Sequence, residues 1–334
     1  MRVLVTGAGG FIGAILLRLL HARQRIGNRP IALLAACDQR LGELPAGVAA
    51  IEGDLGEAQV MERIAALAPD VCFHLAAVPG GAAEADPALS RRVNLHASLD
   101  LFETLANGAA RRGAGEGPPV VVYASTIAVY GHPLPDPVRT DTPARPPMTY
   151  GAHKLACEIV LADFTGRGLL DGRSLRLPGI VARPRAPSGL VSAFMSDVMH
   201  ALKAGEPFTC PVGPSATAWW MSAGRCAQNL VHAAVMVPAA SGADAASRAW
   251  VLPVLRLSME ELVGTLSSVY GVDGRQLVRY TPQPAVEAVF GRYPPLDDRA
   301  ARALGLRDDG TPSALVQRAL DAGFEAAGED DAWR

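Results

Sequence analysis

Residues 3–13 read VLVTGAGGFIG, and this stretch decides the fold of the first half of the chain. A β-branched run before the glycines predicts a buried strand, and the apolar residues after them follow at helical spacing, so the glycines lie at a strand-to-helix turn. Gly7 suits the tight turn, Gly10 lets backbone N–H groups approach a phosphate, and Gly13 lets the helix pack close to the strand. We expect a dinucleotide pyrophosphate at this helix N-terminus. The predicted loop comprises Gly7, Gly10, Phe11, Ile12 and Gly13.

The composition is that of a folded chain with little net charge. The 334 residues are 49% hydrophobic and carry a formal charge of −2, without a long basic run. Disorder is therefore not expected, and neither nucleic acid nor a membrane surface is expected as a partner. The chain enters a strand at once, which leaves no room for a secretion signal, and no apolar stretch is long enough to span a bilayer. These features predict a cytoplasmic enzyme with a small-molecule substrate.

The cysteines indicate no cross-linked or metal-bound framework. There are five, without a C-x-x-C pair: Cys37, Cys72, Cys157, Cys210 and Cys226. An odd, scattered set favours neither disulfides nor a zinc site. We expect reduced packing residues and no metal.

Apolar runs alternate with helical patterns after the glycine turn. Further strands are predicted over residues 31–37, 49–53, 71–75, 120–123 and 174–177, and the first two of these end at Asp38 and Asp54. Helical patterns begin after Glu57, and they recur around 94–110 and 149–165. This alternation predicts a parallel sheet of roughly six strands with helices on both faces. The fold class is therefore α/β, a doubly wound Rossmann sheet.

The second half changes character. Prolines multiply after Arg183, and helical patterns over 190–204, 224–236 and 259–270 mix with short strands. We predict a dinucleotide-binding domain over 1–182 and a smaller, partly interleaved α/β substrate lobe over 183–334, with a return segment to the first domain at about 220–255. The acidic stretch 328–331 is predicted to be a frayed tail.

Tyr150 and Lys154 lie four residues apart in a helical pattern, so their side chains project from one face of the same helix. A tyrosine that exchanges a proton with a substrate hydroxyl needs a stabilised phenolate, because its ordinary pKa is about 10. A nearby ammonium group lowers that pKa. The pair by itself also fits an ordinary amphipathic surface helix.

Ser125 and Thr126 follow the 120–123 run at the carboxyl end of a strand, where open α/β sheets bind ligands. Their hydroxyls can hydrogen-bond a reacting C–O group. By themselves they also fit turn formation at a strand end. Together with the tyrosine and lysine they favour proton and hydride chemistry at a hydroxyl group.

The combined motifs resemble an extended short-chain dehydrogenase/reductase. The matching segments keep their order over roughly the first 180 residues: TGAGGFIG at 6–13, Asp38, HLAA at 74–77, Asn94, YASTIAVYG at 123–131 and TYGAHK at 149–154. The resemblance implies that Tyr150 is the catalytic acid/base and that Lys154 lowers its pKa and binds the nicotinamide ribose. It also implies that Ser125 and Thr126 orient the substrate oxygen.

The same resemblance implies further cofactor contacts. Asp54 and Leu55 would flank the adenine, and Pro178 would lie beside the nicotinamide. Asn94 would support a proton relay, although an asparagine there also fits a helix N-cap. The resemblance also implies that three further residues lie along the cofactor, namely Leu75, Ala76 and Ala77.

Asp38 lies where an acid accepts both hydroxyls of the adenosine ribose. A carboxylate there repels a 2′-phosphate, which favours NAD as the cofactor. Arg40 leaves NADP open, because an arginine accommodates that phosphate.

The second half resembles the D-erythronate dehydrogenase family, which oxidises the 2-hydroxyl of a four-carbon sugar acid with NAD. The resemblance rests on residues 149–184, on SAFMSDVMHAL at 192–202, and on CPV and AWWMSA at 210–212 and 218–223. Arg183 is a candidate partner for the substrate carboxylate, although an arginine between two lobes also fits an ion pair. The turn at Gly80 offers backbone donors to the same group. Trp219 and Trp220 are candidate pocket walls, although adjacent strand residues point to opposite sides, so at least one is expected in the core.

Three other functions fit the first-half motifs to different degrees. A nucleotide-sugar 4-epimerase would use the same tyrosine and lysine, but it needs cations for a diphosphate, and Arg185, Lys203 and Arg225 are scattered. A sugar-nucleotide dehydratase is disfavoured, because no acidic pair follows Thr126. A non-catalytic dinucleotide-sensing protein is disfavoured because the catalytic residues are intact. The resemblance also implies a homodimer formed through the helix over 149–165.

Overall fold

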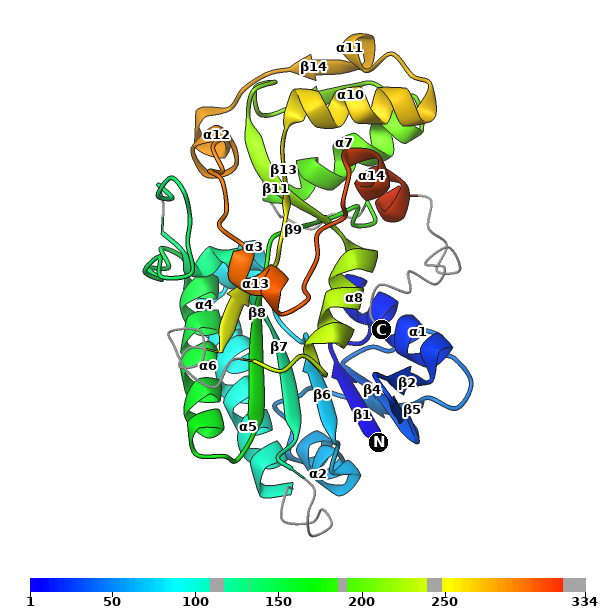
Figure 1. Cartoon of the computed structure of the whole chain (residues 1–334), viewed down its shortest axis with the longest axis vertical. Coiled ribbons are helices and arrows are strands. Elements are labelled where there is room, and N and C mark those ends of the chain that lie inside the picture. Colours follow the sequence, from blue (N-terminus) through cyan, green and yellow to red (C-terminus); the bar gives the residue numbers. More distant parts are fainter. Residues whose placement is uncertain (109–116, 132, 186–190, 239–247, 321–334) are drawn as a thin grey trace.

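The computed structural model describes residues 1–108, 117–131, 133–185, 191–238 and 248–320. Seven strands form its central sheet: β1 (Arg2–Thr6), β4 (Leu33–Asp38), β5 (Ala49–Glu52), β6 (Val71–His74), β7 (Val120–Thr126), β8 (Asp171–Leu177) and β12 (Ala249–Val251). Their order is β12-β8-β7-β6-β1-β4-β5, and every neighbouring pair is parallel (Figure 1). The doubly wound α/β fold is confirmed, with one strand more than predicted.

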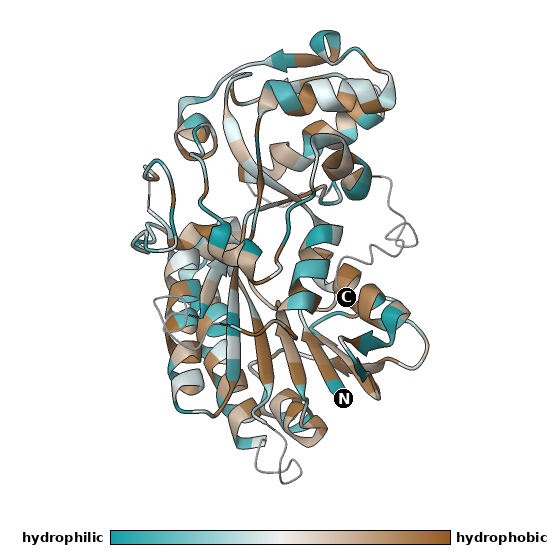
Figure 2. Ribbon diagram, in the orientation of Figure 1, coloured by the Kyte–Doolittle hydropathy of each residue, from teal (hydrophilic) through white to brown (hydrophobic). Residues whose placement is uncertain are grey.

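Helices cover both faces of this sheet. α1 (Phe11–Arg23) and α8 (Ala223–Ala233) pack on one face, and α2 (Ala58–Leu67), α5 (Ala97–Gly108) and α6 (Thr149–Gly166) pack on the other. Successive strand residues serve opposite faces, so Val3 and Val5 join the core under α1, whereas Leu4 joins the core under α5 and α6. Because both faces are buried, the strands are apolar along most of their length (Figure 2).

Several short elements are not predicted by the sequence patterns. β2 (Arg25–Ile26) and β3 (Arg29–Pro30) form a hairpin after α1. α3 (Gly80–Ala85), α4 (Pro87–Ser90) and a π-helical turn, η1 (Arg91–His96), precede α5. Asn94 lies inside this turn, so its alternative interpretation as a helix N-cap is wrong.

A second lobe stands above the sheet in Figure 1 and has its own apolar core. Its strands are β9 (Gly179–Val181), β11 (Thr217–Ser222) and β13 (Leu255–Ser258) in one sheet, and β10 (Phe208–Cys210) with β14 (Val278–Tyr280) in another. Its longer helices are α7 (Phe194–Lys203), α10 (Met259–Tyr270) and α14 (Pro312–Leu320). Other short helices of the two lobes, among the described residues, are η3 (Ile127–Val129), η4 (Val191–Ala193), α11 (Gly274–Leu277), α12 (Pro284–Phe290) and α13 (Arg299–Ala303).

Trp219 and Trp220 both lie in this second core, with 1% and 0% of their surface exposed. Their indole N–H groups donate to the carbonyl oxygens of Pro294 and Leu257. Each ring is therefore fixed by packing and one hydrogen bond, which confirms the expectation that at least one lies in the core, and neither of the two candidate pocket walls lines the cavity.

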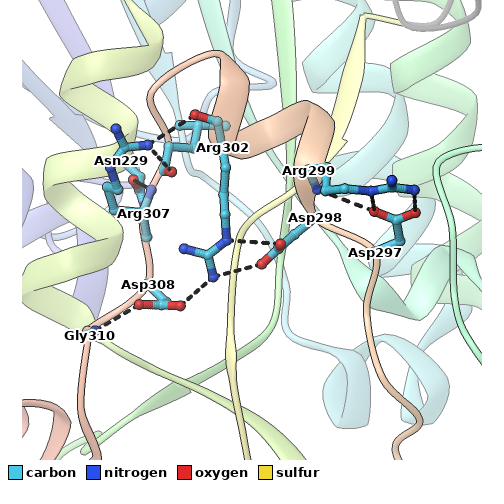
Figure 3. Close-up of polar contacts among 9 residues, drawn as sticks. Asn229, Asp297, Asp298, Arg299, Arg302, Arg307, Asp308 and Gly310 are labelled. Carbon is cyan, nitrogen blue, oxygen red and sulfur yellow. Dashed lines mark hydrogen bonds and ion pairs between the residues drawn. The ribbon is translucent and has the colours of Figure 1, made fainter.

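The chain returns to the central sheet twice after leaving it. The first return falls in the predicted segment: α8 packs on α1, and β12 adds the edge strand beside β8. The second return was not predicted, and it buries Ala301 and Leu306 in the core under α1 and α8. Figure 3 shows how it is held: the Asn229 amide on α8 bonds both backbone groups of Arg307, at 2.8 and 3.0 Å. The proposed domain boundary at 182/183 stays a prediction, and the predicted tail at 328–331 lies outside the described residues.

The five cysteines are free and buried, which confirms them as packing residues. In the part of the chain that the structure describes, no helix has both the length and the apolarity to cross a membrane.

Candidate active site

A cavity of about 480 Å³ opens at the carboxyl ends of the central strands, below α7. It brings together residues from the glycine turn, the ends of β6, β7 and β8, the start of α6 and the second lobe. The predicted site residues that line it are Gly7, Gly10, Phe11, Ile12, Gly13, Leu75, Ala77, Gly80, Ser125, Thr126, Tyr150, Lys154, Pro178 and Arg183.

The glycine turn leaves no room for side chains. Gly7 has a φ of +70°, and a Cβ there would lie 2.6 Å from the backbone nitrogen of Ala76. A Cβ on Gly13 would lie 1.9 Å from the carbonyl oxygen of Gly7, so α1 packs directly on the turn. Gly10 begins α1 without a side-chain cap, and the first helical turn carries no acid. Because no side chain caps this helix N-terminus, its backbone N–H groups suit a dinucleotide pyrophosphate.

The residues predicted at the adenosine end do not line this cavity. Asp38 ends β4, and its Oδ2 accepts the N–H of Gly9 at 3.0 Å, which places the carboxylate beside the glycine turn. Asp54 accepts the side-chain amide of Gln39 at 2.7 Å. Leu55 is buried in the core under α5.

Asn94 is fully buried and holds the chain segment that follows β6. Its Oδ1 accepts the N–H of Val78 at 2.7 Å, and its Nδ2 donates to the Val78 carbonyl oxygen at 3.0 Å. Its backbone oxygen accepts the thiol of Cys157 on α6. Asn94 therefore fixes the loop between β6 and α3 against the helix that carries Tyr150, and its predicted proton relay stays a prediction.

Tyr150 and Lys154 reach the cavity from one face of α6, as their spacing predicts. Burial raises the pKa of Tyr150 to about 12, and the guanidinium of Arg183 opposes that shift. Burial lowers the pKa of Lys154 to about 8. The Lys154 Nζ donates to the Ala124 carbonyl oxygen at 2.9 Å and lies 5.9 Å from the centroid of the Tyr150 ring. The expected lowering of the Tyr150 pKa by Lys154 stays a prediction, and Arg183 is a second cation that acts on this phenol.

The hydroxyl of Ser125 points away from solvent into a buried polar network. It donates to Oε1 of Glu158, whose carboxylate is 3% exposed and pairs with Arg176 at 2.6 Å. Arg176 in turn donates to the hydroxyl of Tyr130 at 2.8 Å. A serine hydroxyl has one proton, so Ser125 faces the cavity only as a hydrogen-bond acceptor.

The Thr126 hydroxyl accepts a hydrogen bond from the protein, whereas the Ser125 hydroxyl donates one. The Thr126 Oγ1 accepts the N–H of Ala128 at 3.1 Å, and among the residues that the structure describes its proton has no acceptor, so it can be donated into the cavity. The sequence predicted one shared role for these two neighbours. In the structure, Ser125 offers the cavity a hydrogen-bond acceptor and Thr126 offers it a donor.

Glu158 and Arg176 were missed in the sequence, although each leaves a signal there. Glu158 stands four residues after Lys154 in the run LACEIVL, and Arg176 is the one charged residue in the predicted strand 174–177, although β8 as a whole also carries Asp171 and Arg173. A single charge in an otherwise apolar element indicates a buried partner, because an unpaired buried charge is costly.

Arg183 follows β9 at the mouth of the cavity. Its N–H donates to Ser196 at 3.0 Å and its carbonyl oxygen accepts from His200 at 2.8 Å, so α7 fixes its backbone. Across the described residues its guanidinium makes no ion pair, and it lies 6.0 Å from the ring centroid of Phe11. Gly80 begins α3 opposite Tyr150, where a Cβ would lie 3.8 Å from the phenol ring.

Comparison with known proteins defines the family. Residues 3–234 match the NAD dependent epimerase/dehydratase family. The chain is 34% identical to D-erythronate dehydrogenase of Cupriavidus necator, over 97% of this chain and 99% of that one. It is 36% identical to UDP-glucose 4-epimerase of Azospirillum brasilense, over 48% of this chain and 44% of that one. The crystal structure of the nucleoside-diphosphate-sugar epimerase from Agrobacterium tumefaciens superposes with a TM-score of 0.88 at 29% identity, covering 97% and 95% of the two chains.

The chain therefore belongs to the NAD-dependent epimerase/dehydratase family, the extended short-chain dehydrogenase/reductases that its motifs predict. It is an NAD-dependent oxidoreductase. The cofactor predicted from the glycine turn and Asp38 is confirmed as NAD.

Proposed function

We propose that this chain oxidises the 2-hydroxyl of D-erythronate to give 2-dehydro-D-erythronate and NADH. The observation that carries the proposal is the convergence of Tyr150, Lys154, Thr126 and Arg183 on one cavity beside the glycine turn. Similarity to the sugar-acid dehydrogenase extends over 97% of the chain and so includes the second lobe. Sequence similarity to the UDP-glucose 4-epimerase covers 48% of the chain, so epimerisation is the second candidate, supported by the fold shared with the nucleoside-diphosphate-sugar epimerase.

The proposed cofactor contacts follow the geometry of the first lobe. The N–H groups at the start of α1 bind the pyrophosphate, Asp38 accepts the adenosine ribose hydroxyls, and Lys154 binds the nicotinamide ribose. When bound, NAD supplies the hydride acceptor, and its nicotinamide ring adds positive charge to the cavity. The remaining proposed cofactor residues are Asp54, Leu55, Leu75, Ala76, Ala77, Asn94 and Pro178.

Tyr150 is the proposed base, and its phenolate oxygen takes the proton of the substrate hydroxyl. A tyrosine whose pKa is raised to about 12 by burial needs nearby positive charge to act as a base. Arg183 and Lys154 supply that charge from the chain itself. Thr126 donates a hydrogen bond to the alkoxide as it develops. The Ser125 oxygen faces the same part of the cavity and accepts a hydrogen bond from a donor there.

Arg183 is the proposed partner of the substrate carboxylate. A guanidinium binds a carboxylate through two parallel N–H donors, which fixes both position and orientation. The backbone N–H groups beside Gly80 lie across the cavity and offer further donors to the substrate.

The test is NADH absorbance with purified protein, NAD and a panel of four-carbon sugar acids, with UDP-sugars assayed in parallel. We expect turnover of D-erythronate and none of the UDP-sugars. Tyr150→Phe should still bind NAD but lose turnover, whereas Tyr280→Phe in the second lobe should retain both. Conversion of a UDP-sugar without oxidation of any acid would replace this function with epimerisation.

We further propose a cytoplasmic homodimer that forms through α6. Ile159 on this helix is 63% exposed and offers an apolar contact to a second copy. Light scattering should give twice the mass of the 34.9 kDa chain, and Ile159→Glu should give the monomer mass. A monomeric wild-type protein would contradict the dimer, and fractionation of the host cell tests the compartment.

A further inference from the structure

Two opposite charges face the same cavity. Arg183 at the end of β9 and Asp197 on α7 both line it, and both side chains are half-buried. Within the described ranges neither charged group forms an ion pair, and the two do not pair with each other. Two residues beyond Arg183, by contrast, Arg185 pairs with Glu206 at 2.8 Å. Charges left unpaired in a concave site are available to a ligand.

Local structure explains only part of the placement of Asp197. It lies in the first turn of α7, where a carboxylate is favoured by the helix dipole. Its neighbours Phe194, Met195 and Val198 are buried against the second lobe. The Ser196 hydroxyl is used by the Arg183 N–H. Asp197 is therefore the group on this helix that remains free to accept hydrogen bonds inside the cavity.

The two charges select for one kind of ligand. A guanidinium binds a carboxylate, whereas a carboxylate accepts only from O–H or N–H donors and repels other anions. A small acid with several hydroxyl groups binds both residues, because its carboxylate pairs with Arg183 and its hydroxyl groups donate to Asp197. A sugar diphosphate would bring further negative charge toward Asp197.

We propose that Asp197 determines substrate specificity, because its carboxylate accepts hydrogen bonds from the hydroxyl groups that lie beyond the oxidised carbon. Arg183 holds the carboxylate at the other end of the same substrate. The inference rests on the proposed function and adds a substrate requirement to it, namely hydroxyls at carbons 3 and 4. Loss of such a hydrogen bond should lower kcat/KM by roughly 10- to 100-fold, because a site built to accept a hydroxyl is left unsatisfied without it.

The experiment compares two substrates and three variants. The substrates are D-erythronate and the 2-hydroxybutanoate of the same configuration, which lacks both distal hydroxyls. The variants are Asp197→Ala, Asp197→Asn and, as a matched control from the exposed pair of this lobe, Glu206→Gln. The rise in Tm caused by D-erythronate is measured for each protein as a readout that does not depend on turnover.

Wild type and Glu206→Gln should prefer D-erythronate by roughly 10- to 100-fold, and Asp197→Ala should lose most of this preference, chiefly through KM. Asp197→Asn should lose less, because the amide oxygen still accepts. D-erythronate should raise the Tm of wild type more than that of Asp197→Ala.

Equal losses on both substrates, or none, would overturn the role of Asp197 while leaving the proposed function intact. A wild-type preference for L-threonine would also overturn it, since Asp197 would then pair with an ammonium group. A wild type that oxidises no four-carbon acid would remove the proposed function and this assignment with it.

Discussion

The buried pair of Glu158 and Arg176 gives the sharpest stability prediction. Glu158 accepts the Ser125 hydroxyl, and the Arg176 guanidinium donates to its two oxygens at 3.0 Å and 2.6 Å. The two side chains are 3% and 10% exposed. Glu158→Gln keeps the shape and the acceptor for Ser125, but it leaves a buried guanidinium without a counter-charge.

The magnitude follows from that geometry. Breaking a buried ion pair by removing one partner costs about 3–5 kcal/mol of the free energy of unfolding, whereas replacing both partners by uncharged residues is often nearly neutral. At about 2 °C per kcal/mol, Glu158→Gln should lower Tm by about 6–10 °C. The double variant Glu158→Gln, Arg176→Met should lie much closer to wild type than either single variant, because no charge is left alone.

The assay is thermal and urea unfolding of the wild type, the two single variants and the double variant. Glu206→Gln is the control, because it breaks the exposed pair with Arg185, whose side chains are 46% and 54% exposed. It should change the free energy of unfolding by less than about 1 kcal/mol. The reasoning is refuted if Glu158→Gln behaves like this control, or if the double variant loses the sum of the two single losses.

Three further predictions concern the site itself. Thr126→Val should lower kcat by about 10²-fold and Ser125→Ala by less, because only the threonine has a proton free for the developing alkoxide; similar losses in steady-state kinetics would argue against this division. Arg183→Met should move the ascending limb of the kcat/KM pH profile to higher pH by about one pH unit, since removing a cation raises the pKa of Tyr150 and the phenolate then forms only at higher pH. An unmoved limb would assign the lowering of that pKa to another group. Gly13→Ala would place a Cβ 1.9 Å from a backbone carbonyl oxygen, so calorimetry should find NAD binding lost and stability reduced by about 1–3 kcal/mol, and normal binding would contradict the close packing of α1 on the turn.

Features that depend on neighbours in the chain could be predicted from the sequence. The glycine turn is fixed by backbone conformation and by the space a Cβ would need, and both are local properties of VLVTGAGGFIG. The shared face of Tyr150 and Lys154 follows from helical periodicity alone. Buried parallel strands are continuous apolar runs, so the alternation of strands and helices was readable as well.

Features that depend on residues far apart in the chain were decided by the tertiary structure. Nothing near 299–306 indicates that this segment returns to the core under α1 and α8, because turns and short helices take their partners from the whole fold. The direction of the Ser125 hydroxyl depends on Glu158, which lies 33 residues away on α6. The pKa of Tyr150 likewise depends on Arg183, which follows β9. Spacing along a chain gives the chemistry that a residue type can perform, but proton direction, burial and charge balance depend on which distant side chains the fold brings within a few ångströms.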